Sequence, residues 1–290
     1  MLSTSGDLVD RLWLFPADEP TLALGVPFVA APGPHPLLFA GDALAFTATA
    51  PEDLVGVTAF TVQVFGRRPT SLIEQVPGAR PGDVWIISDG GAGPSSATLL
   101  VAGVPFPTGA LEGIELVAAG ALDGLLVTPA DRDTFGPIAY WSPGGGLAEL
   151  DGVPRSWVRV LTASGDLAAV EQSGRVAVID LVEGRIITQF SHSSSVASAC
   201  FSPAGDYLAM VLDERERNLL VLQFEPYVSG SELELAGGPV QSVTWTGPRE
   251  LVAASPSELV VIDPTRNRRS PVASLSGPGE WRLVSDRATC

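Results

Sequence analysis

The sequence predicts an all-β protein, and three observations lead to this fold class. Runs of four to eight residues rich in Val, Leu, Ile and Phe alternate with clusters of Gly, Pro, Asp and Ser, which is typical of short strands joined by turns. No segment has a long run of apolar residues at the spacing of a helix. The strand-like runs also recur with a period of about forty residues.

The period is clearest in the second half of the chain. Three similar apolar runs begin at residues 176, 219 and 259, so they lie 43 and 40 residues apart. Each is the third of four strand-like runs, and four short antiparallel strands per repeat describe one blade of a β-propeller. The predicted first strands are Trp157–Leu161, Val196–Phe201 and Val240–Trp245, the second Asp166–Val170, Asp206–Leu212 and Glu250–Ala254, the third Val176–Asp180, Leu219–Gln223 and Leu259–Asp263, and the fourth Arg185–Phe190, Ser231–Leu235 and Ser270–Leu275.

Comparable third strands are predicted toward the N-terminus, at Ile138–Ser142, near Thr98–Gly103, at Thr61–Phe65 and at Arg11–Phe15. Seven third strands in 290 residues correspond to seven blades of about 41 residues each. The order of the strands between Gly82 and Gly120 is hard to assign, so six blades remain the alternative.

The two ends of the chain supply complementary strands. Glu280–Ser285 reads as a single first strand, whereas Asp10–Phe15 and Thr21–Leu24 read as a third and a fourth strand. Neither end completes a blade alone, so we expect one propeller domain over residues 1–290, closed by strands from both termini. Such closure protects edges that would otherwise pair with other chains.

Part of the fifth full repeat resembles a WD-repeat protein. The family's blade begins with Gly-His, continues to a strand ending Phe-Ser-Pro-x-Gly, and then to a strand ending Leu-Ala; Ser191–Ala209 follows this pattern, with Ser191 in place of the Gly. The Trp-Asp pair that names the family becomes Leu222-Gln223 here. The resemblance implies a structural hydrogen-bond network of His192 with Asp213. It also implies a non-enzymatic scaffold on which a protein partner of unknown identity binds.

The composition argues against nucleic acid and membranes as partners. With 33 acidic and 17 basic residues the formal charge is -16, which argues against nucleic acid and against an anionic membrane surface. Two uncharged stretches, Thr21–Gly41 and Gly90–Leu111, are interrupted by several prolines, so we expect no membrane insertion. All basic residues are Arg, which indicates a high-GC bacterial genome.

The start of the sequence predicts the location of the protein, and the spacing of its two cysteines predicts their role. No basic segment followed by an apolar one begins the sequence, so a cytoplasmic protein is expected, or an extracytoplasmic one if a leader or anchor was removed. Cys200 and Cys290 match no metal or redox spacing, and Cys200 is predicted to be a small core residue. The six Trp residues all lie in strand-like runs and are predicted to be core residues.

No catalytic residue, cofactor site or metal site is predicted. His35 lies in a Pro-rich turn, His192 is assigned a structural role, and no nucleophile elbow, zinc or phosphate-binding motif occurs. The enzyme alternative is a metal-dependent propeller hydrolase or lactonase with a site over the central channel. Such a site needs several converging carboxylates. Glu115, Asp83 and Asp286 are the conceivable contributors.

The charged loops are the remaining candidates for a functional surface. One face of the propeller would gather the second-to-third-strand loops, with Glu52 and Asp53, Asp131-Arg132-Asp133 and Asp213–Arg217, while the opposite face would carry Arg67, Arg68, Arg266, Arg268 and Arg269. One interpretation is that these loops only keep an apolar-rich protein in solution. The other is a surface that binds a protein partner, because Arg is enriched at interface hot spots. The candidate partner-binding residues are Asp131, Arg132, Asp133, Glu214, Arg215 and Glu216.

Overall fold

A computed structural model describes most of the chain. The described residues are 2–5, 8–14, 21–24, 28–29, 37–40, 43–47, 54–58, 61–64, 73–80, 83–88, 95–101, 104–150, 152–213, 218–224, 229–274 and 280–283. Apart from one four-residue helix, α1 (Arg132–Phe135), the regular structure in these ranges is β. The protein is therefore all-β, as the sequence predicts.

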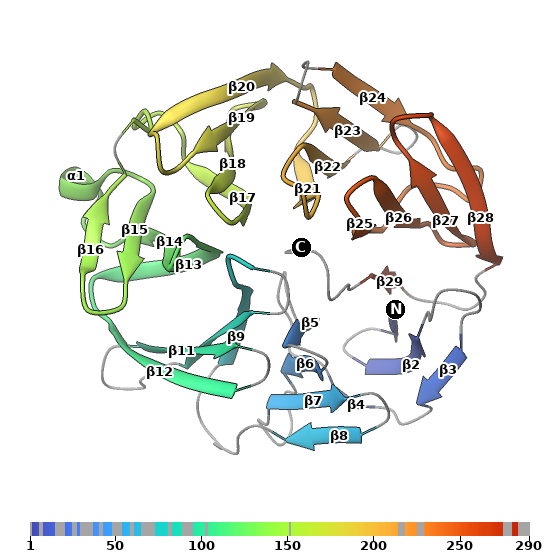
Figure 1. The fold of residues 1–290 in the computed structure, drawn as a ribbon, viewed down its shortest axis with the longest axis horizontal. Coiled ribbons are helices and arrows are strands. Elements are labelled where there is room, and N and C mark those ends of the chain that lie inside the picture. The colour runs from blue at the N-terminus through green and yellow to red at the C-terminus, as the bar shows by residue number, and fades with distance from the viewer. Residues whose placement is uncertain are drawn as a thin grey trace.

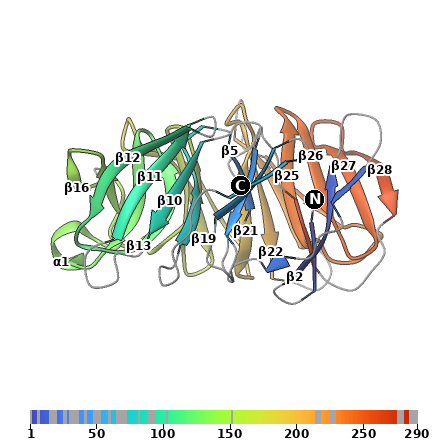
Figure 2. The ribbon, with the colours of Figure 1, turned by 90° about the horizontal axis from the view of Figure 1, so that it is seen from below.

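Five sheets of four antiparallel strands follow one another through the part of the chain from residue 73 to residue 274. Figure 1 shows them arranged around a common centre, with the first strands of the later sheets innermost and the fourth strands outermost. In the side view the strands run between two flat faces (Figure 2). The sheets are β9 (Ile73–Pro77), β10 (Val84–Ser88), β11 (Ser95–Val101) and β12 (Val104–Leu111); β13 (Ile114–Ala121), β14 (Gly124–Pro129), β15 (Ala139–Ser142) and β16 (Gly146–Glu149); β17 (Arg159–Ser164), β18 (Leu167–Gln172), β19 (Arg175–Asp180) and β20 (Arg185–Ser191); β21 (Val196–Phe201), β22 (Tyr207–Leu212), β23 (Leu219–Gln223) and β24 (Ser229–Leu233); and β25 (Ser242–Gly247), β26 (Glu250–Ala254), β27 (Glu258–Asp263) and β28 (Arg268–Ser274).

The earlier strands are described by their pairing. β5 (Leu37–Ala40), β6 (Ala43–Thr47), β7 (Leu54–Thr58) and β8 (Thr61–Val64) pair in that order. β29 (Glu280–Arg282) pairs antiparallel with β1 (Leu2–Ser5), and Ser3 lies opposite Trp281. The same sheet continues through β2 (Leu8–Leu14) to β3 (Thr21–Leu24), and β4 (Phe28–Val29) pairs with β2.

Most of the predicted strand order is confirmed, with one error. The twelve strands expected between residues 157 and 275 correspond to β17–β28 in the expected order. The run predicted as a third strand at Thr61–Phe65 is instead β8, a fourth strand, and β7 is the third. Third and fourth strands in this chain are both short apolar runs, so the residue pattern alone does not distinguish them. β1, with the sequence Leu-Ser-Thr-Ser, is too polar to be detected by an apolar pattern.

The core lies between neighbouring sheets. Trp85 of one sheet and Trp141 of the next are both buried, and their rings meet edge to face with centroids 6.1 Å apart. Farther along, the indole Nε1 of the fully buried Trp245 donates a 3.0 Å hydrogen bond to the carbonyl oxygen of Cys200, which is also buried. Four predicted core tryptophans (Trp85, Trp141, Trp157 and Trp245) are thus confirmed. Trp13 and Trp281 lie in β2 and β29, where only the backbone is described, so their burial stays a prediction.

The segment that carries the WD-repeat resemblance forms a turn between β21 and β22. The Ser202 hydroxyl donates to the Asp206 carboxylate (2.9 Å) and accepts from the Tyr207 backbone N–H (3.1 Å). Gly205 has a φ of 76°, which a residue with a Cβ rarely adopts. The motif residues are therefore explained by the local geometry of this turn.

No helix among the described residues is long and apolar enough to cross a bilayer.

Candidate interaction face

We call one end of the sheets the charged face; it is the end at which β13, β17 and β21 begin. In three sheets, a backbone hydrogen bond joins the end of the second strand, or the residue just after it, to the residue just before the first strand. Ala130 N donates to Gly113 O (2.8 Å), Val158 N to Glu171 O (3.2 Å), and Asp213 N to Ser195 O (2.8 Å). The second-to-third-strand connections and the connections between sheets therefore share this face.

The helix α1 presents the first predicted group of residues, Asp131, Arg132 and Asp133, on the charged face. All three are exposed. Asp131 is the N-cap residue: its carboxylate accepts hydrogen bonds from Thr134 Oγ1 (2.7 Å) and Thr134 N (3.2 Å). These bonds, the one from the side chain first, lower the pKa of the Asp131 carboxyl, so it carries its charge at neutral pH.

Two arginines attach α1 to the sheets. Arg132 Nη2 lies 2.7 Å from Glu115 Oε2, in an ion pair whose two side chains are half exposed. Arg155, in the connection between β16 and β17, donates to the carbonyl oxygens of Asp133 (2.8 Å) and Thr134 (3.2 Å) and to Glu149 Oε1 (3.0 Å). Because Arg155 binds three acceptors, it holds the end of the helix in place.

A third arginine on this face is held by a nearly buried carboxylate. Arg159 Nη1 lies 3.1 Å from Glu171 Oε2; the Arg159 side chain is 51% exposed and that of Glu171 12%. The other carboxylate oxygen, Oε1, lies 3.7 Å from His192 Nε2. Glu171 therefore lies between a cationic side chain and an imidazole.

His192 is buried as a structural residue would be, with a 4% exposed side chain. Neither ring nitrogen has a hydrogen-bond partner among the described residues, so the network with Asp213 implied by the resemblance is not formed. The carboxylate beside His192 is that of Glu171 in β18, whereas Asp213 is bound to Ser195 through its backbone. The backbone N–H of His192 donates to Gly174 O (2.9 Å).

Two aliphatic side chains are exposed near the starts of β13 and β17, at the same end of the sheets as Arg159. Val158 is 58% and Leu116 53% exposed. At the far ends of β13 and β17, Leu122 N donates to Gly165 O (2.8 Å). Counting back from this hydrogen bond, Leu116 lies six residues before Leu122, and Arg159 lies six residues before Gly165. Each of these two stretches contains one β-bulge, so the two strands advance by the same length. Leu116 and Arg159 are therefore at the same level along the first strands of two neighbouring sheets.

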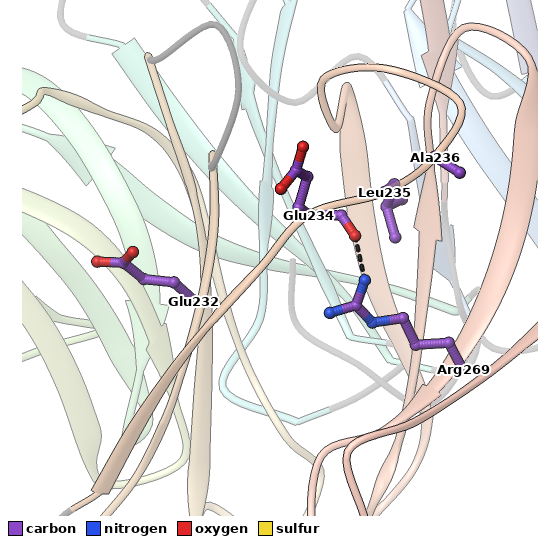
Figure 3. Close-up of a pocket in the computed structure, with 5 residues that line it drawn as sticks. All are labelled: Glu232, Glu234, Leu235, Ala236 and Arg269. Atoms are coloured by element: carbon purple, nitrogen blue, oxygen red, sulfur yellow. Dashed lines mark hydrogen bonds between the residues drawn. The ribbon is translucent and has the colours of Figure 1, made fainter.

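The second predicted group on this face, Glu214, Arg215 and Glu216, lies outside the described residues, as do Glu52, Asp53, Arg67 and Arg68. Near the outer strands β24 and β28, the Arg269 guanidinium donates to the backbone carbonyl oxygen of Glu234. A shallow groove of about 510 Å³ lies there, in which Glu232 extends away from Arg269 (Figure 3). It is lined by Glu232, Glu234, Leu235, Ala236 and Arg269.

Of the three carboxylates expected for a hydrolase, the two in the described ranges, Glu115 and Asp83, lie at opposite ends of the sheets. Glu115 lies at the start of β13, on the charged face. Asp83 lies between the first and second strands of its sheet, and the equivalent turns meet at the opposite end, where Gly165 N donates to Ala79 O (2.7 Å). Asp286 lies outside the described residues. Within the described ranges, no three His, Cys, Asp or Glu residues are grouped as metal ligands would be.

Three solved structures share the arrangement of the sheets. Hsv2 of Kluyveromyces lactis matches with a TM-score of 0.56 and 14% identity, over 93% of this chain and 95% of that one. The Cps50 (Swd1) β-propeller domain of Myceliophteria thermophila matches with a TM-score of 0.52 and 17% identity, over 86% and 88%. The WD40 β-propeller domain of Doa1 matches with a TM-score of 0.50 and 14% identity, over 88% and 84%. No family model and no curated protein matches the chain. At these identities the likeness concerns the fold.

Proposed function

Because the chain has the WD40 β-propeller fold, we propose that it is a non-enzymatic scaffold that binds a protein partner through the charged face. Propellers of this type typically serve as platforms for other proteins, which is an argument from analogy between folds. The observation that supports this particular surface is the set of arginines on the charged face, Arg132, Arg155 and Arg159, each held by a glutamate or by backbone carbonyls.

Held arginines suit a binding surface for a physical reason. Fixing a long side chain on binding costs about 0.5–1.5 kcal/mol, and an arginine that is already held loses less of that freedom. Arginine is also enriched among residues that dominate binding energy. We assign partner contacts to Asp131, Arg132 and Asp133 on α1, and to Glu214, Arg215 and Glu216 in the connection between β22 and β23.

The proposal includes an architecture for the whole chain. We propose one domain over residues 1–290, with seven blades closed by strands from both termini. The pairing of β29 with β1 supports this closure. Leu283 N, just after β29, also donates to Ser242 Oγ (3.0 Å) in β25 of the adjacent sheet.

The experiment is affinity capture with the purified protein as bait, followed by identification of the bound protein and measurement of its affinity. The test variant is Arg132→Ala/Arg215→Ala, and the matched control is Arg185→Ala/Arg266→Ala, which removes two arginines near the turns at the opposite face. We expect about a tenfold or greater loss of affinity for the test variant only. Equal binding of both variants, at unchanged melting temperature, contradicts the assignment to the charged face.

A further inference from the structure

Arg159 differs from the other arginines of the charged face in what holds it. The carboxylate of Glu171 is largely removed from water, whereas Glu115 and Glu149, which pair with Arg132 and Arg155, are half exposed. A buried carboxylate is costly to leave unpaired, so Glu171 holds the Arg159 guanidinium more firmly than a surface partner would. The buried ring of His192 covers the other side of the carboxylate.

The guanidinium of Arg159 still has donors to offer. It carries five N–H groups, and its ion pair with Glu171 uses Nη1 alone. Among the described residues no second carboxylate pairs with Arg159. A half-exposed guanidinium with unused N–H groups matches a carboxylate, which accepts two hydrogen bonds in parallel.

Exposed apolar residues near Arg159 indicate that a partner would also need an apolar side chain. Val158 precedes it directly, and Leu116 lies level with it on the neighbouring strand; both side chains are more than half exposed. Isolated aliphatic residues on a surface need no explanation. Here Val158 precedes a held arginine and Leu116 lies at its level on the first strand of the neighbouring sheet, so the same end of the sheets offers a charged contact and an apolar one.

We infer that Arg159, Leu116 and Val158 form the anchor point for a partner segment in which an Asp or Glu lies next to a large apolar residue. The acidic group binds Arg159, and the apolar side chain covers Leu116 and Val158. Glu171 and His192 act as positioning residues behind the arginine. This inference rests on the proposed function, because it names the chemistry of the partner at the same face.

The net charge of -16 does not prevent an acidic segment from binding here. Charges farther from the contact than the Debye length, about 10 Å at 0.1 M salt, are largely screened. A direct carboxylate–guanidinium contact is screened much less, so it decides the local preference.

The test uses a phage-displayed library of random linear peptides, selected against the full-length protein. We expect enrichment of peptides that place Asp or Glu beside Leu, Ile, Val or Phe. Their affinity is expected to fall about tenfold or more in Arg159→Met, which removes the guanidinium but keeps an apolar stem. In Arg185→Met, the matched control at the opposite face, affinity is expected to remain unchanged.

A second variant covers the case in which Arg159→Met does not fold. Val158→Ser changes an exposed side chain without touching the ion pair, and we expect it to weaken the same peptides several-fold. Enrichment of basic or wholly apolar peptides, retention of binding in the anchor variants, or no enrichment at all would overturn the inference. A partner captured by the protein whose affinity depends on Arg132 but not on Arg159 would overturn it while leaving the proposed function standing.

Discussion

The hydrogen bond of Trp245 across two sheets supports a prediction about stability. Trp245 in β25 is fully buried, packs beside Tyr207 with ring centroids 5.7 Å apart, and donates through its indole N–H to Cys200 O. Substitution by Phe keeps an aromatic ring but removes the donor. The carbonyl oxygen of Cys200 would then remain buried without its indole partner.

The expected magnitude follows from two contributions. The smaller ring buries less apolar surface, which costs about 1 kcal/mol at roughly 25 cal/mol per Å². The buried carbonyl oxygen that loses its partner costs about 1–3 kcal/mol more. We therefore expect Trp245→Phe to lower the free energy of unfolding by about 2–4 kcal/mol. Trp245→Ala would remove roughly 200 Å² of buried ring, or about 5 kcal/mol, and is too severe to separate the two contributions.

Trp141→Phe is the matched control. Trp141 is also buried and also packs against an aromatic ring, but no indole hydrogen bond of Trp141 is present among the described residues. We expect this variant to lose about 1 kcal/mol. The measurement is urea unfolding followed by far-UV circular dichroism, with midpoints compared at equal slope. If the two variants differ by less than about 0.5 kcal/mol, the indole hydrogen bond contributes no stability and the reasoning is wrong.

Three further predictions concern the charged face and the chain ends. Arg155→Ala removes the donor that holds the end of α1, so we expect faster amide hydrogen exchange at residues 132–136. Exchange in β18 serves as the control and is expected to remain unchanged. Unchanged exchange at residues 132–136 as well would contradict this role of Arg155. Because the folded-state pKa of Asp131 is lowered, its contribution to stability is present above its unfolded pKa, near 3.9, and is lost as pH falls through the lower folded pKa. Carboxyl NMR titration checks this, and a midpoint above that of a model Asp peptide would refute it. Deletion of residues 279–290 removes β29 and frees the edge of β1, so we expect a lower melting temperature and concentration-dependent association in sedimentation experiments; a monomer of unchanged melting temperature contradicts the proposed closure.

The sequence pattern predicts the structure correctly where a feature depends only on residues close together in the sequence. Apolar runs of four to eight residues between Gly, Pro, Asp and Ser clusters predict strands, and the recurrence of the pattern predicts the order of β17–β28. The Phe201–Asp206 turn is recognisable because its geometry is local: Ser202 bonds both Gly205 and Asp206 within this stretch. The pattern failed at residues 61–65, because strand position within a sheet depends on pairing rather than on residue type.

The charged face was predicted only in part. Asp131, Arg132 and Asp133 were chosen from a run of charges, and they do lie on this face. Arg155, Arg159 and Glu171 were missed, although a glutamate inside the apolar strand Leu167–Gln172 is a usable signal for a buried ion pair. The resemblance paired His192 with Asp213, whereas the structure places His192 beside Glu171.

The sequence by itself determined that this protein consists of short antiparallel strands in repeated groups of four, because short apolar runs and the turn residues between them act over a few neighbouring positions. Only the tertiary structure decided which charges meet. Arg132 and Glu115 are 17 residues apart in sequence, and Arg159 and Glu171 are 12 apart. Such pairs form through the register of neighbouring strands and the packing of connections at one end of the sheets, and no local pattern encodes that geometry.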